Sequence, residues 1–145
     1  ASCNDADRES RAACALAATV SGFAYSNSRP NVCHGVGSPL TLFWNVDHGQ
    51  SVCLTLATFL RSQAEAISHK LPALWDAMGV LGLEEATQRL TEIIERCGLE
   101  TRLSELGLKE GDMETLLDNV KWDRLTTLPR PLGRESVAPL LRRLL

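Results

Sequence analysis

The sequence has few of the features that mark membrane, secreted or nucleic-acid-binding proteins. No apolar run reaches the roughly 18 residues of a membrane-spanning helix, and no basic-then-apolar signal peptide opens the chain. The formal charge of −3 gives no electrostatic reason to bind nucleic acid or an anionic membrane. We therefore expect a soluble, cytoplasmic protein with no nucleic-acid and no membrane partner.

Cysteine is too scattered to build a framework. The five cysteines are odd in number and widely spaced, and they include no Cys-x-x-Cys pair. They therefore predict neither a disulfide framework nor a thiolate zinc site. Most fall inside apolar helical patterns and are expected to be small core side chains. They are Cys3, Cys14, Cys33, Cys53 and Cys97.

Helical periodicity runs through the whole chain. No stretch alternates with period two, and no glycine-rich nucleotide-binding loop occurs, so neither strands nor a nucleotide site are indicated. Pro39 favours a short or kinked helix, and Gly98 suits a helix C-terminus. With 145 residues, 44% of them hydrophobic, we expect one all-α domain, a helical bundle. Helices are predicted at about 7–26, 32–44, 48–63, 71–78, 84–97, 110–120 and 134–144.

Two of the three histidines, His34 and His48, are each followed by glycine. Pro39 and an expected turn at 45–47 favour a helix–turn–helix in which the two imidazoles converge. The glycines leave room for another element or a ligand beside each ring. On spacing alone, hydrogen-bonded core histidines are the more frequent outcome, because a divalent metal takes at least three protein donors. His69 lies in a polar stretch and is predicted to be a surface residue.

The segment 31–52, NVCHGVGSPLTLFWNVDHGQSV, resembles the signature of the iron-containing alcohol dehydrogenase family. In that family a histidine, a proline five residues later and a His-Gly fourteen residues later open the buried helix of the C-terminal domain. His34, Pro39 and His48 hold these positions. The resemblance covers essentially the whole chain. Residues 98–107 resemble the family's Gly-x-x-x-x-Leu-x-x-x-Gly segment, and residues 129–137 resemble its closing Pro-Arg and final helix.

The resemblance implies an NAD(P)-dependent oxidoreductase that transfers hydride between nicotinamide and a small alcohol or aldehyde. It implies a Rossmann-like N-terminal cofactor domain, absent from this chain, and a helical metal-binding domain spanning 1–145. The divalent metal, iron(II) or alternatively zinc, is held in that family by an aspartate and three histidines. By motif position His34 and His48 are the last two of these ligands, and the other two are expected before residue 1. No catalytic or cofactor-binding residue is assignable within the chain.

Two positions depart from the family pattern. Many members carry a second histidine four residues after the first of these ligands, where this chain has Ser38. A histidine proton relay is therefore unsupported, although the Ser38 hydroxyl can make a polar contact in an active site. Leu128 replaces the asparagine that often precedes the closing Pro-Arg. The sequences around Ser38 and after His48 look more like an aldehyde-reducing branch that includes phosphonoacetaldehyde reductases.

The chain begins with Ala-Ser rather than Met, which favours a fragment of a longer dehydrogenase that is inactive by itself. An alternative hypothesis is a free-standing helical interaction module that retained the fold without the chemistry. A third is a different metalloenzyme in which His34 and His48 complete a site across a homodimer.

Overall fold

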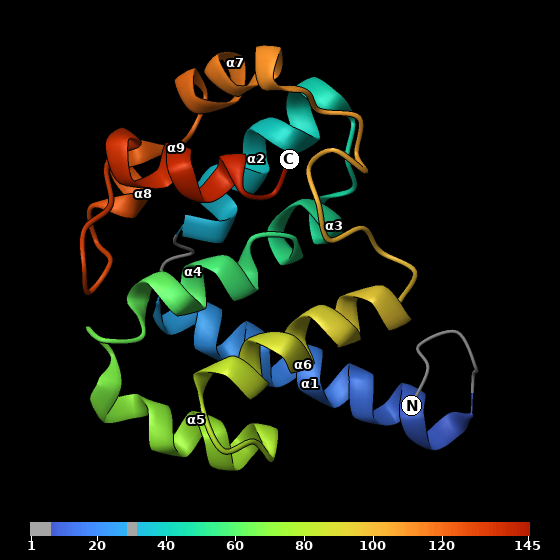
Figure 1. Cartoon of the computed structure of the whole chain (residues 1–145). Coiled ribbons are helices and arrows are strands. Elements are labelled where there is room, and N and C mark those ends of the chain that lie inside the picture. The colour runs from blue at the N-terminus through green and yellow to red at the C-terminus, as the bar shows by residue number, and fades with distance from the viewer. Residues whose placement is uncertain (1–6, 29–31) are drawn as a thin grey trace.

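The regular elements of the computed structural model are all helical across the residues it describes, 7–28 and 32–145 (Figure 1). The all-α prediction is therefore confirmed. The helices are α1 Arg8–Asn27, α2 Val32–Trp44, α3 His48–Cys53, α4 Leu56–Gln63, α5 Leu71–Met78, α6 Leu83–Arg96, α7 Met113–Asp118, α8 Trp122–Leu125 and α9 Arg134–Arg142, with short 3-10 turns at Ser68–Lys70 and Glu110–Asp112.

Helix α2 lies at the centre of the hydrophobic core. It packs against α3, α4, α7 and α8, and α9 packs in turn on α7. Val36 and Leu40 of α2 are fully buried, as are Leu116 of α7 and Leu125 of α8. Burying leucine side chains to this degree contributes about 1.5–3 kcal/mol each. The core therefore fixes the position of α2, which carries one of the two candidate histidines.

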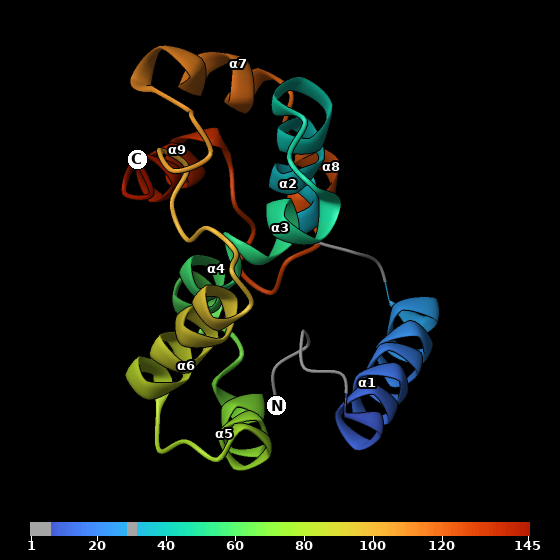
Figure 2. The same ribbon diagram turned by 90° about the vertical axis from the view of Figure 1, so that its right-hand side faces the viewer.

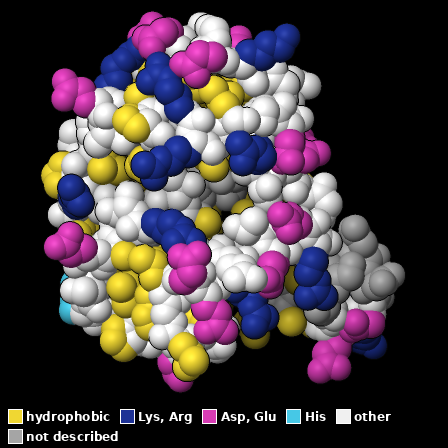
Figure 3. Space-filling view, viewed as in Figure 1, with side chains coloured by type: hydrophobic (Ala, Val, Ile, Leu, Met, Phe, Trp, Pro, Cys, Tyr) yellow, Lys and Arg dark blue, Asp and Glu magenta, His cyan; other side chains and the backbone are white. Residues whose placement is uncertain are grey.

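Helices α4, α5 and α6 form a second group below this core in Figures 1 and 2. α4 packs on α6, and an exposed two-point ion pair joins Arg61 of α4 to Glu84 of α6. An exposed ion pair of this kind contributes only about 0–1 kcal/mol. On the face shown in Figure 3, acidic and basic side chains alternate around apolar ones, without a large region of one sign.

No residue of α1 is buried, although its sequence has an apolar stripe. Asp7 caps it, accepting a hydrogen bond from the Ser10 N–H at 2.7 Å. Figure 2 shows α1 standing to one side of the other helices. Leu16 and Phe23 are 65% and 67% exposed. Within the described residues, no helix has both the length and the apolar character needed to cross a membrane.

The predicted helix over 48–63 is instead two helices, α3 and α4, separated by a turn at Leu54 and Thr55. Leu56 is 39% exposed in this stretch, and four of its buried residues are polar, namely Gln50, Ser51, Thr55 and Gln63. The cysteine prediction holds only in part. Cys33 is buried, Cys53 and Cys97 are half-buried, Cys14 is exposed on α1, and Cys3 lies outside the described residues.

Candidate metal centre

A single proline organises the first histidine helix. Pro39 lies inside α2, which remains one helix from Val32 to Trp44. Because proline has no N–H, the carbonyl of Gly35 loses its usual helical partner. The backbone N–H of Lys121, just before α8, donates to that carbonyl at 3.1 Å. The carbonyl that the proline leaves free is therefore the point at which the segment before α8 attaches to α2, one residue after His34.

The two glycines of α2 allow neighbouring helices to come close. A Cβ at Gly35 would lie 2.7 Å from Cδ1 of Leu125 in α8. A Cβ at Gly37 would lie 2.9 Å from the backbone oxygen of Ser51 in α3. The side-chain oxygens of Thr41 and Ser51 are 3.1 Å apart across the same contact. Glycine thus permits close approach on both sides of α2, and the Gly37 contact, which is with backbone atoms, brings α3 against the histidine helix.

A two-point hydrogen bond fixes the second histidine helix. The connection between α2 and α3 contains Asn45 in the left-handed region (φ 53°), a conformation that asparagine tolerates. Asp47 occupies the N-cap position of α3, but its side chain makes no capping bond. Two residues after His48, the buried Gln50 amide donates to the Glu100 carbonyl at 2.7 Å and accepts from the Glu100 N–H at 2.9 Å.

These contacts bring the imidazoles of His34 and His48 together, with ring centroids 5.3 Å apart and planes tilted by 59°. An imidazole nitrogen lies ~1.2 Å from its ring centroid and binds zinc at ~2.1 Å, so two rings on one tetrahedral ion have centroids about 5 Å apart. The donor set and its spacing therefore fit two ligands of one metal. His34 is half-buried and His48 is exposed, which leaves one side of the pair open.

The electrostatic surroundings favour a neutral first ligand. Burial lowers the pKa of His34, and the neighbouring His48 and Arg124 lower it further. A neutral imidazole keeps a lone pair available to a metal. The Tyr25 ring of α1 also lies near His34, with centroids 6.4 Å apart.

The pair alone supplies fewer donors than a metal site needs. In the described part of the chain, no cluster of three or more His, Cys, Asp or Glu side chains is placed to hold a metal. His69 is exposed, as the sequence predicts. The Ser38 hydroxyl donates to the His34 carbonyl at 2.7 Å, so this oxygen is left able to accept but not to donate. A metal held by the pair would need further donors from outside these residues.

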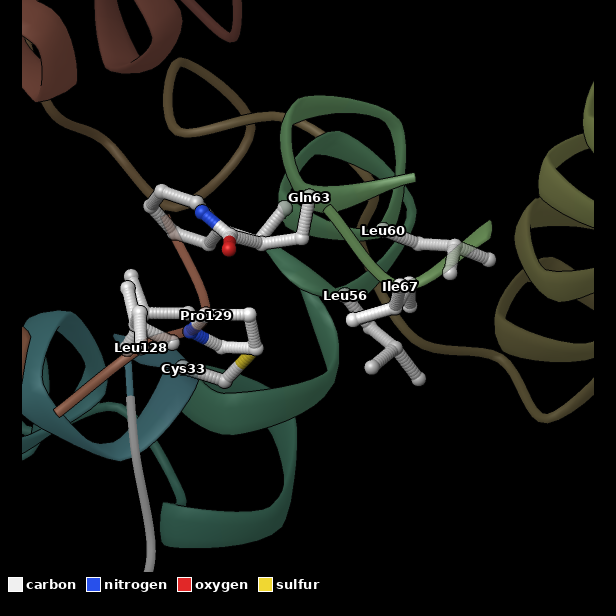
Figure 4. A pocket seen from close by; sticks show the side chains of 9 residues that line it. Cys33, Leu56, Leu60, Gln63, Ile67, Leu128 and Pro129 are labelled. Carbon is white, nitrogen blue, oxygen red and sulfur yellow. The ribbon is translucent and has the colours of Figure 1, made fainter. Parts of the chain in front are cut away.

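A separate pocket of ≈ 210 Å³ lies between α4, the start of α2 and the loop at Leu128 (Figure 4). Its polar lining is the Cys33 thiol and the Gln63 amide. That amide already donates to the Arg130 carbonyl and accepts from the Arg130 N–H, each at 3.0 Å. Burial raises the pKa of Cys33 to about 11, which keeps the thiol protonated. The pocket is below the usual 300 Å³ of ligand sites and offers few polar contacts.

Sequence reasoning missed two residues around the pair. Gln50 follows the His48-Gly49 motif directly, but nothing in its spacing indicates a contact with Glu100, fifty residues away. Arg124 lies on α8, a four-residue helix too short to show periodicity. Neither residue carries a local sequence signal for its position.

Comparison with known proteins supports one family. The model of the Fe-containing alcohol dehydrogenase family, C-terminal, matches residues 1–145. Lactaldehyde reductase of Escherichia coli (strain K12) is 27% identical over 118 residues, covering 76% of this chain and 31% of that protein. NAD-dependent methanol dehydrogenase of Bacillus methanolicus is 26% identical over 150 residues, covering 96% and 39%. The solved alcohol dehydrogenase from Oenococcus oeni superposes with a TM-score of 0.75 at 19% identity, covering 86% and 35%. The chain thus spans about a third of the length of these relatives.

Proposed function

Because the chain belongs to the iron-containing alcohol dehydrogenase family, we propose that it is the metal-binding helical part of an NAD(P)-dependent alcohol dehydrogenase or aldehyde reductase. In this proposal His34 and His48 are two of the ligands of a divalent metal, iron(II) or zinc. The observation that carries it is the convergence of the two imidazoles, with centroids 5.3 Å apart, at the family's motif positions.

The relatives' lengths support a larger enzyme around this chain. A Rossmann-like cofactor domain and the remaining ligands belong to the residues that the relatives have and this chain lacks. Their names associate the family with small alcohols and aldehydes and, for one of them, with NAD. We expect the 145 residues alone to be inactive, because two imidazoles are too few protein donors for a catalytic metal.

In this proposal the residues of this chain hold the metal and orient the two imidazoles that bind it. A bound divalent metal supplies Lewis acidity toward an alcohol or carbonyl oxygen, while the nicotinamide cofactor carries the hydride. His34 presents a neutral imidazole whose helix is fixed by Pro39 and Gly37. His48 presents the second imidazole from a helix that Gln50 holds in place. Ser38 can accept a hydrogen bond beside them.

Metal titration of single histidine variants tests the assignment. We expect the chain to bind Co²⁺ with a d–d spectrum, and His34→Ala or His48→Ala to weaken that binding by at least about tenfold, as loss of a ligand should exceed loss of an outer-shell contact. His69→Ala is the matched control, because His69 is exposed and lies outside the pair. Unchanged Co²⁺ affinity in both pair variants would refute the ligand assignment.

The exposed apolar face of α1 favours a second candidate, a helical interaction module. Leu16, Val20 and Phe23 are each more than half exposed, and such a stripe is typical of a surface that a partner covers. Histidine variants discriminate between the candidates, since a module without chemistry would show no Co²⁺ binding that depends on His34 and His48.

A further inference from the structure

Each candidate ligand has a serine hydroxyl bonded to its backbone carbonyl. The Ser38 hydroxyl donates to the His34 carbonyl at 2.7 Å, and the Ser51 hydroxyl donates to the His48 carbonyl at 2.8 Å. The two serines differ in their surroundings. Ser38 is half-buried on α2, whereas Ser51 is fully buried on α3 and meets a side chain of α2. Ser51 therefore links one histidine to the helix that carries the other.

The contact between Ser51 and Thr41 of α2 has a defined direction. Their oxygens are 3.1 Å apart, and each hydroxyl has one proton to donate. The Ser51 proton is used in the 2.8 Å bond to the His48 carbonyl, so Ser51 accepts from Thr41. Another acceptor for Thr41, the Gly37 carbonyl of its own helix, is farther away at 3.5 Å. Two successive hydrogen bonds thus run from α2 to the backbone of His48.

The surroundings of these two bonds leave them little freedom. Ser51 is 0% exposed, so water cannot replace Thr41 as its partner unless the helices separate. The Ser51 Oγ also lies 3.1 Å from the position that a Cβ of Gly37 would take. Helix α3 has only six residues and depends on such contacts, because a helix of that length is not stable by itself. The bond from Thr41 to Ser51 therefore sets where the start of α3 lies relative to α2.

We propose that Thr41 and Ser51 are positioning residues for the metal site. Through the His48 carbonyl they hold the second imidazole at its spacing from that of His34. The inference rests on the proposed function, because this spacing matters for binding only if both imidazoles hold one ion. Gln50 does not replace the two hydroxyls, since its bonds attach α3 to the segment after α6 and not to α2. Neither hydroxyl has to touch the metal, because both act through the backbone of α3.

The first experiment measures the spacing of the imidazoles without metal. Their ring centroids are 5.3 Å apart, close enough for a nuclear Overhauser effect between ring protons in NMR. We expect this effect to weaken in Thr41→Val, which replaces the hydroxyl by a methyl group, and to persist in Thr41→Ser. Thr87→Val is the matched control, because Thr87 is a buried threonine whose hydroxyl bonds within α6. An effect that is absent from the wild type, or unchanged in Thr41→Val, would overturn the positioning role.

The second experiment measures Co²⁺ affinity. We expect Thr41→Val and Ser51→Ala each to weaken binding by about threefold to tenfold, the equivalent of one net hydrogen bond. The double variant should bind no more weakly than the weaker single variant, because both side chains act through the same pair of bonds. Thr41→Ser and Thr87→Val should bind like the wild type. Losses that add up in the double variant would show that Thr41 and Ser51 act separately, and would overturn the proposal.

The positioning role and the proposed function fail in different ways. Co²⁺ affinity that is the same in His34→Ala, His48→Ala and the wild type refutes the proposed function, and the metal-free Overhauser effect then decides whether Thr41 positions the imidazoles. Co²⁺ affinity that depends on both histidines but is unchanged in Thr41→Val overturns the positioning role alone.

Discussion

Replacing Gly37 by alanine tests whether the closeness of α2 and α3 builds the histidine pair. The added Cβ would lie 2.9 Å from the Ser51 backbone oxygen, 3.0 Å from the Ser51 carbonyl carbon and 3.1 Å from its Oγ. Two of these are backbone atoms of α3, which the Gln50–Glu100 bonds hold in place. The helices must therefore separate, and overpacking of this kind costs about 1–3 kcal/mol.

The helix propensity of alanine acts in the opposite direction, by about 1 kcal/mol relative to glycine. Gly49→Ala provides the matched control, because it makes the same chemical change in the second histidine motif and its Cβ would meet nothing within 4 Å. Because both variants replace glycine by alanine in a helix, the difference between their free energies of unfolding isolates the clash at Gly37. We expect Gly37→Ala to be less stable than Gly49→Ala by about 1–3 kcal/mol.

The assay is thermal unfolding followed by helical circular dichroism, together with Co²⁺ titration. At about 2–4 °C per kcal/mol for a chain of this size, the midpoint of Gly37→Ala should lie roughly 2–12 °C below that of Gly49→Ala. Co²⁺ affinity should fall only in Gly37→Ala, since only there do the imidazoles move apart. Equal midpoints with equal Co²⁺ affinities would refute the role assigned to this contact.

Three further predictions concern other parts of the chain. Gln50→Ala should destabilise the chain by about 2 kcal/mol in urea unfolding, because it leaves the backbone N–H and carbonyl of Glu100 without their partners. Phe23→Ser should change stability by no more than about 0.5 kcal/mol, because Phe23 is 67% exposed; a larger loss would show that α1 is packed in solution. Burial raises the pKa of the Cys33 thiol from 9.0 to about 11. The stability linked to that proton is therefore present below pH 9 and lost as pH rises through 11, up to about 3 kcal/mol. The free energy of unfolding of the wild type relative to Cys33→Ala should therefore decrease between pH 7 and pH 11 in urea unfolding.

Local signals in the sequence predicted much of the fold. The Asp7 cap, the helix over 32–44 and the left-handed Gly98 at the end of α6 are set by interactions within a few residues. The break between α3 and α4 is different. Gln50 attaches α3 to Glu100, and Gln63 attaches α4 to Arg130. Each half of the expected helix thus docks on a distant segment, and apolar periodicity contains no information about such partners.

The candidate site also combines features that are set by local sequence with features that depend on distant segments. The spacing of His34 and His48 together with the family signature predicted their convergence, because the turn between them is local. The effect of Arg124 on the pKa of His34 depends on the packing of α8 against Gly35. That packing joins residues almost ninety positions apart. The exposed face of α1 was also unpredicted, because an amphipathic pattern indicates that a helix can be covered but not which residues cover it.

Helix α2 explains why the motif contains glycine and proline as well as histidine. Gly35 admits α8, Gly37 admits α3, and Pro39 frees the carbonyl that accepts from Lys121. These three positions contact other elements on different sides of α2, and His34 remains half-buried beside the imidazole of His48. A substitution at any of the three should therefore alter the spacing of the imidazoles without removing a donor atom. The motif from His34 to Gly49 is in this sense also a signature of helix packing, and Gly37→Ala compared with Gly49→Ala tests the packing contribution.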